Sequence, residues 1–169
     1  MSVISVETDT EALILRIVTE FDASPDRVWL LWADPRRLDR WWGPPGYPAT
    51  FTKHDLAPGS RVEWHMAGPD GTRQHGYWEI VEADAPSRLV LRDGFADSDG
   101  RPSADIEAHE VRVTIQAVDD GRTRMTVENV FPSRDVMDRL LAMGMAEGFV
   151  ASLDQIDAVL NAAANRDGP

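Results

Sequence analysis

Five polar residues stand where strand alternation would turn them toward an apolar interior: Gln74, Asp93, Glu107, His109 and Asn129. Folding back the polar loop at 94–105 brings Asp93 near Glu107, and Asn129 lies opposite Val111, one step along from His109. A histidine near carboxylates in an apolar cavity can act as a general base, or can anchor a ligand carbonyl or hydroxyl. His109 and Asp93 are therefore the candidate catalytic residues. The alternative is that these positions lie hydrated at an open rim.

Apolar side chains on the same strand face form a second group, suited to binding. Trp64 and Trp78 could stack against a planar compound, because a core that needs only filling would more naturally use aliphatic residues. Met143, Met145 and Phe149 on a later helix would form an adaptable roof. Ordinary core packing is the alternative for both tryptophans. The predicted ligand-binding residues are Trp64, Met66, Trp78, Leu91, His109, Val111, Val113, Met125, Val127, Asn129, Met145 and Phe149.

Other reactive patterns are incomplete. His65 and His75 face each other across a predicted hairpin, but they lack a third ligand and their face is assigned to solvent. The sequence DSDG at 97–100 matches half of a calcium loop without its later acidic ligands. No serine lies in a nucleophile motif, and the chain has no cysteine. We therefore predict neither a metal nor a cofactor.

Composition limits the partners. The chain has 169 residues and a formal net charge of −12. Nucleic acids and anionic membranes require clustered Lys and Arg, and the local cluster of Arg36, Arg37 and Arg40 is small. No charged segment followed by an apolar one stands at residues 1–30, so we expect no signal sequence, and no apolar run approaches the roughly 18 residues of a membrane span. We expect a cytoplasmic protein that binds neither nucleic acid nor membrane.

The elements that must position the candidate residues belong to one domain, 1–169. Residues 1–10 and 162–169 are polar and aperiodic at the two ends, so we expect loose termini around a core at 12–161. β-favouring residues at 11–21 predict the first strand.

Two short helices and a set of hairpins follow the first strand. Ser24 and Asp34, each followed by proline, predict helix starts, and the second helix reaches Trp41 or Trp42. The turns GPDG at 68–71 and DDG at 119–121 fix two hairpin registers. These registers set apolar residues on one face, and a slip of one residue would set apolar residues against charged ones. The pairs are Met66–Gln74, Trp64–Gly76, Val62–Trp78, Arg61–Glu79, Ile115–Met125, Thr114–Thr126, Val113–Val127 and Arg112–Glu128.

The last long apolar pattern predicts one helix from Ser133 to Leu160, with Ser133 as its N-cap. Gly144 and Gly148 interrupt it one turn apart, each at about 1 kcal/mol relative to alanine. One interpretation is that these glycines allow close contact between the helix backbone and the sheet. The other is that they leave room for a ligand beneath the helix.

Sequence motifs along residues 12–161 carry a family resemblance. They are FDASPDRVWLLWADPRRLDRWWGP, PGSRVEWHMAGPDG, APSRLV, GRTRMTVENVF and MAEGFVASLDQIDAVL. With them the chain resembles the START-like helix-grip (SRPBCC) superfamily, in the branch named after the activator of the heat-shock protein 90 ATPase. The resemblance implies an α+β fold: a curved antiparallel sheet of six to seven strands wrapped around a long C-terminal helix, with two short helices after strand 1. It also implies a cavity between sheet and helix that often receives a lipophilic molecule.

Three functions agree with this sequence. The leading hypothesis is binding of a hydrophobic or aromatic small molecule in the cavity. The first alternative is a polyketide cyclase, dehydratase or hydrolase with His109 or Asp93 as acid or base. The second is a chaperone-linked protein-interaction domain, which predicts an exposed apolar patch at 41–47 and a filled interior. A homodimer through an edge strand or that same segment stays open.

Overall fold

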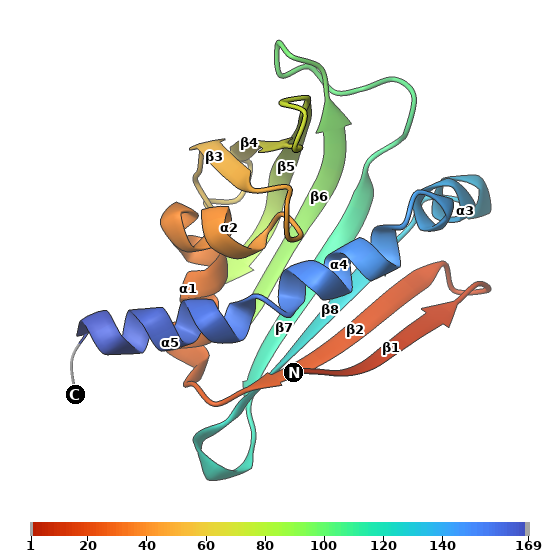
Figure 1. The fold of residues 1–169 in the computed structure, drawn as a ribbon. Helices are drawn as coiled ribbons and strands as arrows, with labels where there is room; N and C mark the ends of the chain where they lie inside the picture. Colours follow the sequence, from red (N-terminus) through yellow and green to blue (C-terminus); the bar gives the residue numbers. More distant parts are fainter. Residues whose placement is uncertain (1, 168–169) are drawn as a thin grey trace.

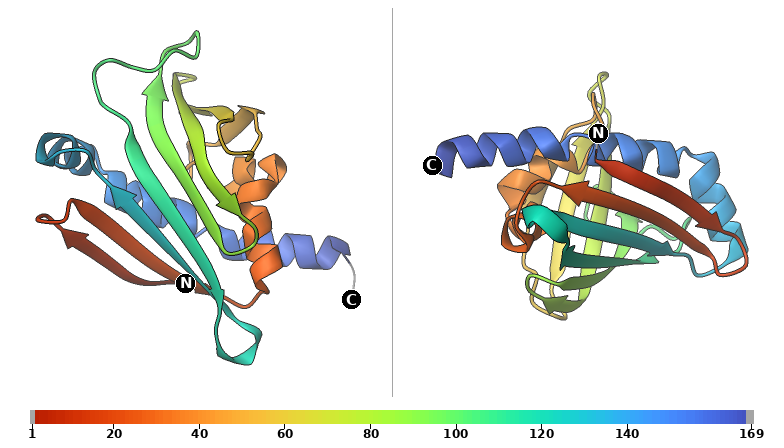
Figure 2. Two further views of the ribbon diagram at one scale, coloured as in Figure 1. Left: turned by 180° about the vertical axis from the view of Figure 1, so that it is seen from behind. Right: turned by 90° about the horizontal axis from the view of Figure 1, so that it is seen from below.

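The computed structural model describes residues 2–167, which form a curved antiparallel sheet crossed by helices (Figure 1). The sheet order is β1-β2-β8-β7-β6-β5-β4-β3. Figure 2 shows α4 and α5 running across the sheet. The predicted α+β helix-grip architecture is confirmed. The elements are β1 (Val3–Asp9), β2 (Ile14–Phe21), α1 (Pro25–Ala33), α2 (Pro35–Trp41), β3 (Ala49–Lys53), β4 (Arg61–Ala67), β5 (Arg73–Asp84), β6 (Arg88–Ala96), β7 (His109–Ala117), the 3-10 turn η1 (Asp119–Gly121), β8 (Thr123–Val130), α3 (Arg134–Ala142), α4 (Met145–Leu153) and α5 (Ile156–Asp167).

Both predicted hairpin registers are confirmed. In the β4–β5 pair Trp64 lies opposite Gly76, and in the β7–β8 pair Val113 lies opposite Val127. The first turn closes with Gly71 at φ 82°, in the left-handed region that glycine adopts without strain. Because a one-residue slip would exchange the two faces of a strand, these registers decide which side chains face the helices.

The N-terminal segment is a strand, which corrects the prediction of a loose end at 1–10. β1 pairs with β2, so the sheet has eight strands rather than six or seven. The sequence signal is weak because β1 is an edge strand: Ile4 and Val6 are 54% and 46% exposed, and most of its other residues are polar. β2 begins at Ile14, three residues later than predicted.

The predicted single helix at 133–160 is three helices, which is a second correction. Gly144 adopts φ 87°, a left-handed conformation that separates α3 from α4. A second break at 154–155 separates α4 from α5. α5 then continues to Asp167, so residues 162–167 are helical rather than a loose end.

Aromatic side chains from α1, α2 and strands β3 to β5 form one cluster on the sheet. Trp42 contacts four other indoles, with ring centroids 5.0 Å from Trp78, 5.5 Å from Trp41 and 5.9 Å from Trp32 and from Trp64. Edge-to-face pairs of this kind add about 0.5–1.5 kcal/mol beyond the burial of their area. Side chains fill this part of the interior, because Trp32 and Trp78 have no exposed surface.

Hydrogen bonds join the C-terminal helices to the end of α2. Gln155 Nε2 donates to Gly43 O at 2.7 Å and to Trp41 O at 3.3 Å, and the Ser152 hydroxyl donates to Trp42 O at 3.0 Å. The last carbonyls of a helix lack partners within it, so these side chains satisfy them, at about 1 kcal/mol for each bond. We call this arrangement the carbonyl clamp. It holds the α4–α5 junction on the aromatic cluster.

Gly76→Ala should destabilise the protein, because the new Cβ would lie 2.2 Å from the buried Trp64 ring. We expect the free energy of unfolding, measured by urea denaturation, to fall by about 1–3 kcal/mol. Gly148→Ala is the matched control, since no atom lies within 4 Å of its Cβ position. It should raise that free energy by up to about 1 kcal/mol, because alanine favours a helix. Equal effects of the two changes would contradict this packing.

Candidate ligand-binding site

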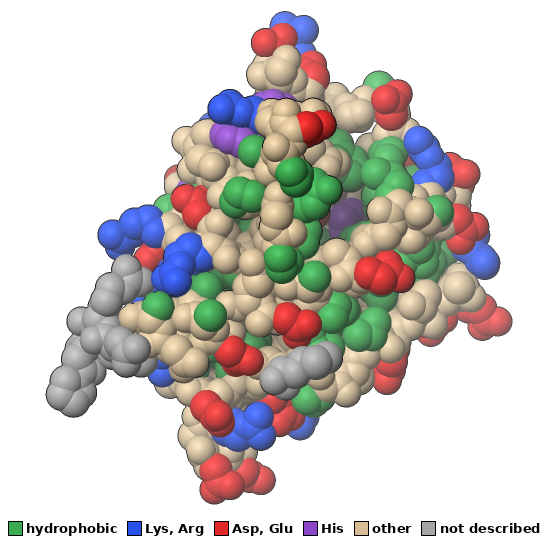
Figure 3. Space-filling view, viewed as in Figure 1, with side chains coloured by type: hydrophobic (Ala, Val, Ile, Leu, Met, Phe, Trp, Pro, Cys, Tyr) green, Lys and Arg blue, Asp and Glu red, His purple; other side chains and the backbone are tan. Residues whose placement is uncertain are grey.

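A half-open cavity of about 250 Å³ lies between α4 and strands β4 to β7. Most of its lining side chains are aromatic or aliphatic, and Asp93 and His109 add polar groups from β6 and β7. Figure 3 shows the hollow on this face, with a histidine at its floor and hydrophobic side chains around it. The cavity therefore combines apolar walls with a small number of titratable groups.

Two glycines face this cavity from its roof. Gly144 and Gly148 both line it, and no atom lies within 4 Å of the position that a Cβ would take on either residue. The interpretation that these glycines bring the helix backbone into close contact with the sheet is therefore wrong. The space beneath α4 agrees with the alternative interpretation, in which they leave room.

Asp93 and His109 lie directly opposite each other on β6 and β7. Burial raises the pKa of the Asp93 carboxyl to about 7. Burial also lowers the pKa of His109 to about 4, against a smaller raising effect from its hydrogen bond to Asn129. The Asp93 side chain is half-buried: it faces the cavity, through which solvent can reach it, and protein atoms surround the rest of it. Near pH 7 the imidazole is neutral and the carboxyl is divided between its two protonation states.

His109 is fixed by two contacts. Its Nε2 lies 3.0 Å from Asn129 Oδ1, and its ring stacks on Phe131 with centroids 5.3 Å apart. With the amide oxygen facing the ring, Nε2 carries the proton and Nδ1 remains an acceptor. Within residues 2–167, the Asp93 side chain makes neither a hydrogen bond nor an ion pair. The site can thus exchange a proton at Asp93 or accept a hydrogen bond at either group.

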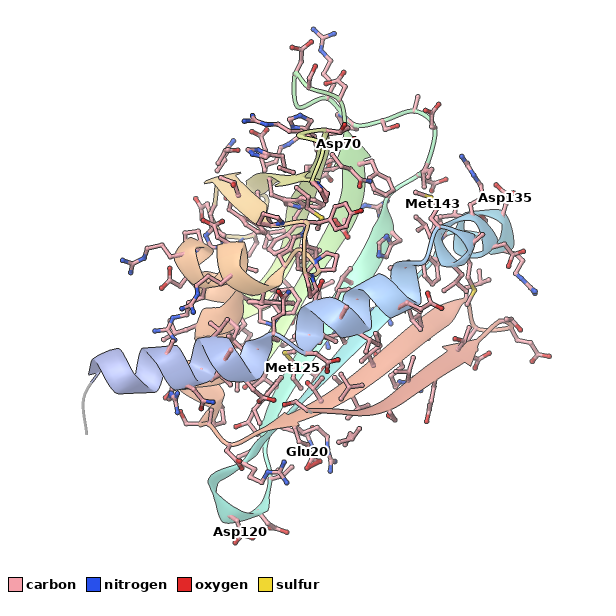
Figure 4. All side chains as sticks on the ribbon, in the orientation of Figure 1. Glu20, Asp70, Asp120, Met125, Asp135 and Met143 are labelled. Carbon is pink, nitrogen blue, oxygen red and sulfur yellow. The ribbon has the colours of Figure 1, made fainter. Side chains whose placement is uncertain are left out.

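The structure divides the predicted ligand-binding residues into two groups. Trp64, Met66, His109, Met145 and Phe149 line the cavity. The others are buried behind it: Trp78, Leu91, Val111, Val113, Met125, Val127 and Asn129. Figure 4 labels Met143 beside α3 and Met125 near the junction of α4 and α5. Met143 lines the cavity, whereas Met125 is completely buried and does not. That any of the twelve binds a ligand stays a prediction.

Several residues that line the cavity lie outside the strands, so the alternation of side chains along a strand could not predict them. Trp42 and Pro44 follow α2, Ile106 lies in the loop before β7, and Leu140 lies on α3. The Trp-Trp-Gly-Pro motif marks Trp42 in the sequence, but the predicted position of Trp42 at the end of the second short helix does not indicate a cavity residue. Leu140 had no such signal, because its position depends on the turn at Gly144.

His65 and His75 face each other as predicted, with ring centroids 5.7 Å apart. In the part of the chain that the structure describes, no group of three or more His, Cys, Asp or Glu side chains could hold a metal ion. None of the helices within residues 2–167 combines the length and the apolar character that crossing a membrane requires.

The fold defines a START-like helix-grip (SRPBCC) domain. Residues 22–161 match the family described as Activator of Hsp90 ATPase homolog 1-like protein, and the chain belongs to that family. No curated protein matches the chain.

Solved structures of similar proteins agree with this assignment. The crystal structure of protein Ms6760 from Mycobacterium smegmatis is 42% identical, with a TM-score of 0.86 over 94% of this chain and 96% of that chain. A solution structure of a protein from Arthrobacter aurescens is 44% identical, with a TM-score of 0.91 over 95% of this chain and 92% of that chain. The AHSA1 protein from Silicibacter pomeroyi, at 22% identity and a TM-score of 0.69 over 89% and 99% of the two chains, shares the fold.

Asp93→Asn should stabilise the protein more at alkaline than at acidic pH. The carboxyl has a pKa of about 7 in the folded protein against an ordinary value of 3.8, so between these values the folded state holds more protons. The stability of the wild type should therefore fall relative to the variant as pH rises from 4 to 7, and the difference should level off above pH 8. Because solvent reaches the Asp93 carboxyl in part, the change in this stability difference should not exceed a few kcal/mol. Urea unfolding of both proteins at pH 4.5, 6 and 8 measures their free energies of unfolding. A difference between them that is independent of pH would contradict the burial of this carboxyl.

Proposed function

We propose that the protein binds a hydrophobic or aromatic small molecule in the cavity between α4 and the sheet. The observation that carries this proposal is the open space of about 250 Å³ beneath a helix whose glycines face it. Membership of a family with the helix-grip fold, which commonly binds hydrophobic ligands, supports the same conclusion.

The size of the cavity favours a ligand of one or two rings. Its volume lies just below the roughly 300–1,000 Å³ of sites for drug-sized ligands. It exceeds the roughly 150 Å³ of an engineered cavity that binds benzene. Each Å² of apolar ligand surface removed from water contributes about 25 cal/mol, so a compound of this size could bind through burial and a few polar contacts.

The aromatic walls that such a ligand would meet are Trp42, Trp64, Phe95 and Phe149, rather than Trp78. The Trp42 ring lies 5.9 Å from Trp64 and 5.8 Å from Phe149, in edge-to-face arrangements. Trp78 is completely buried in the aromatic cluster and does not line the cavity. The mouth includes Met143, which is 59% exposed and flexible enough to adapt to a ligand.

Catalysis is the second candidate function, and Asp93 is the residue that favours it. A carboxyl whose pKa is raised to about 7 can give or take a proton at neutral pH. His109 suits this role less, because its lowered pKa of about 4 makes it a weak base. In this alternative Asp93 is the acid or base acting on a polyketide-like substrate, and Asp93→Asn would abolish turnover while His109→Ala would reduce it less.

The protein-interaction hypothesis loses the surface on which it depended. Trp41 and Trp42 are buried, and the remaining large apolar side chain of the 41–47 segment is Tyr47, 49% exposed. The interior also contains a cavity rather than being filled. A homodimer through an edge strand stays a prediction.

Gly148→Leu should prevent binding by filling the cavity from its roof. We expect the affinity for 1-naphthol, a neutral two-ring probe, to fall at least tenfold in isothermal titration calorimetry. Ala158→Leu is the matched control, because it adds the same kind of bulk at an exposed position of α5 and should leave the affinity within twofold. Equal binding by the two variants, or no binding to the wild type, would contradict the proposed function.

A further inference from the structure

The lining of the cavity is acidic. Among the described residues, its carboxyl groups are Asp93 and Glu107, and it includes no Lys or Arg. His109 adds no positive charge, because burial lowers its pKa to about 4. Arg73 lines a neighbouring hollow at the ends of β5 and β6 and does not line this cavity. A carboxylate or phosphate ligand would therefore meet like charge without a compensating cation.

Asp93 faces this space without a partner. Its side chain makes no hydrogen bond or ion pair within residues 2–167, and the group opposite it on β7 is the neutral His109. An ionised carboxylate in such surroundings is unfavourable unless an opposite charge accompanies it. A cation within a few ångströms would supply that charge and favour the ionised form. The protein itself provides none here, so the ligand is the remaining source.

Aromatic rings border the same space. Trp42, Trp64, Phe95 and Phe149 line the cavity, and the rings of Trp42 and Phe149 meet at 87°. Aromatic faces attract organic cations by about 0.5–2 kcal/mol, and walls at right angles can contact two sides of one ammonium group. The overall charge of −12 also raises the concentration of cations near the surface.

We propose that the ligand of this cavity is an organic cation, an amine or quaternary ammonium group attached to a small apolar body. The positive group lies at Asp93, and the body packs against Trp64 and Phe149 beneath α4. This inference rests on the proposed function and specifies the class of ligand. It sets the protein apart from a carrier of fatty acids or other anions.

Three probes of similar size separate charge from shape. Benzyltrimethylammonium is a permanent cation, neopentylbenzene replaces its nitrogen with carbon, and 4-phenylbutyrate is an anion. We expect the wild type at pH 8 to bind the cation at least tenfold more tightly than the neutral isostere, and to bind the anion most weakly. Asp93→Asn should lower the affinity for the cation at least tenfold and change that for the isostere by less than twofold. Asp120→Asn, which removes one charge in the distant η1 turn (Figure 4), is the matched control and should change neither affinity.

The pH dependence of the wild type provides a second readout that requires no variant. The charged or titratable groups around Asp93 are His109 from β7, Glu107 from the preceding loop and Tyr77 from β5, while the residues of α4 that line the cavity are uncharged. Because the pKa of Asp93 is about 7, the ionised fraction falls about tenfold from pH 8 to pH 6. The affinity for benzyltrimethylammonium should fall by the same factor, and that for neopentylbenzene should not.

The outcomes distinguish this inference from the proposed function. If neopentylbenzene binds as tightly as the cation at pH 8, or if Asp93→Asn keeps the preference for the cation, charge recognition is wrong and the proposed function stands. If 4-phenylbutyrate binds most tightly, the inference is likewise wrong. If none of these probes nor 1-naphthol binds, both are wrong.

Discussion

The carbonyl clamp is the constraint on which the rest of the interior depends. Ser152 and Gln155 satisfy the carbonyls at the end of α2, which fixes the α4–α5 junction on the aromatic cluster. From that junction α4 extends over the sheet toward Gly144, where the chain turns into α3. The helix is therefore held at one end by hydrogen bonds and ring packing, and the cavity lies beneath the rest of it.

The same arrangement explains the electrostatics of the cavity floor. Strand pairing sets Asp93 against His109, and it sets Asn129 of β8 against Val111, two residues after His109 on β7, so Asn129 can reach the imidazole diagonally. That bond occupies His109 and leaves the Asp93 carboxyl facing apolar walls. Burial then raises the pKa of the carboxyl and lowers that of the imidazole, so neither group neutralises the other. An acidic group in an aromatic cavity is the result.

Local sequence signals predicted the hairpins well and the cavity incompletely. Turn chemistry at Gly71 and Gly121 determined the registers, and these placed Trp64 and His109 on the correct face. The strand face of a residue did not show that Trp64 lines the cavity whereas Trp78 is buried in the aromatic cluster. This difference depends on where Trp42, which lies outside the sheet, packs against the two rings. Apolar periodicity also runs through the helix breaks, so it could not show that Gly144 changes the direction of the chain.

Methionine methyl groups offer the most direct test of the cavity, because they lie both in it and behind it. Met66, Met143 and Met145 line the cavity, whereas Met125 and Met137 are completely buried elsewhere. In the protein labelled with ¹³C at the methionine methyls, saturation with 1-naphthol should give intermolecular NOEs to the first three and none to the other two. NOEs confined to Met125 and Met137, or none at any methionine, would contradict a ligand cavity beneath α4.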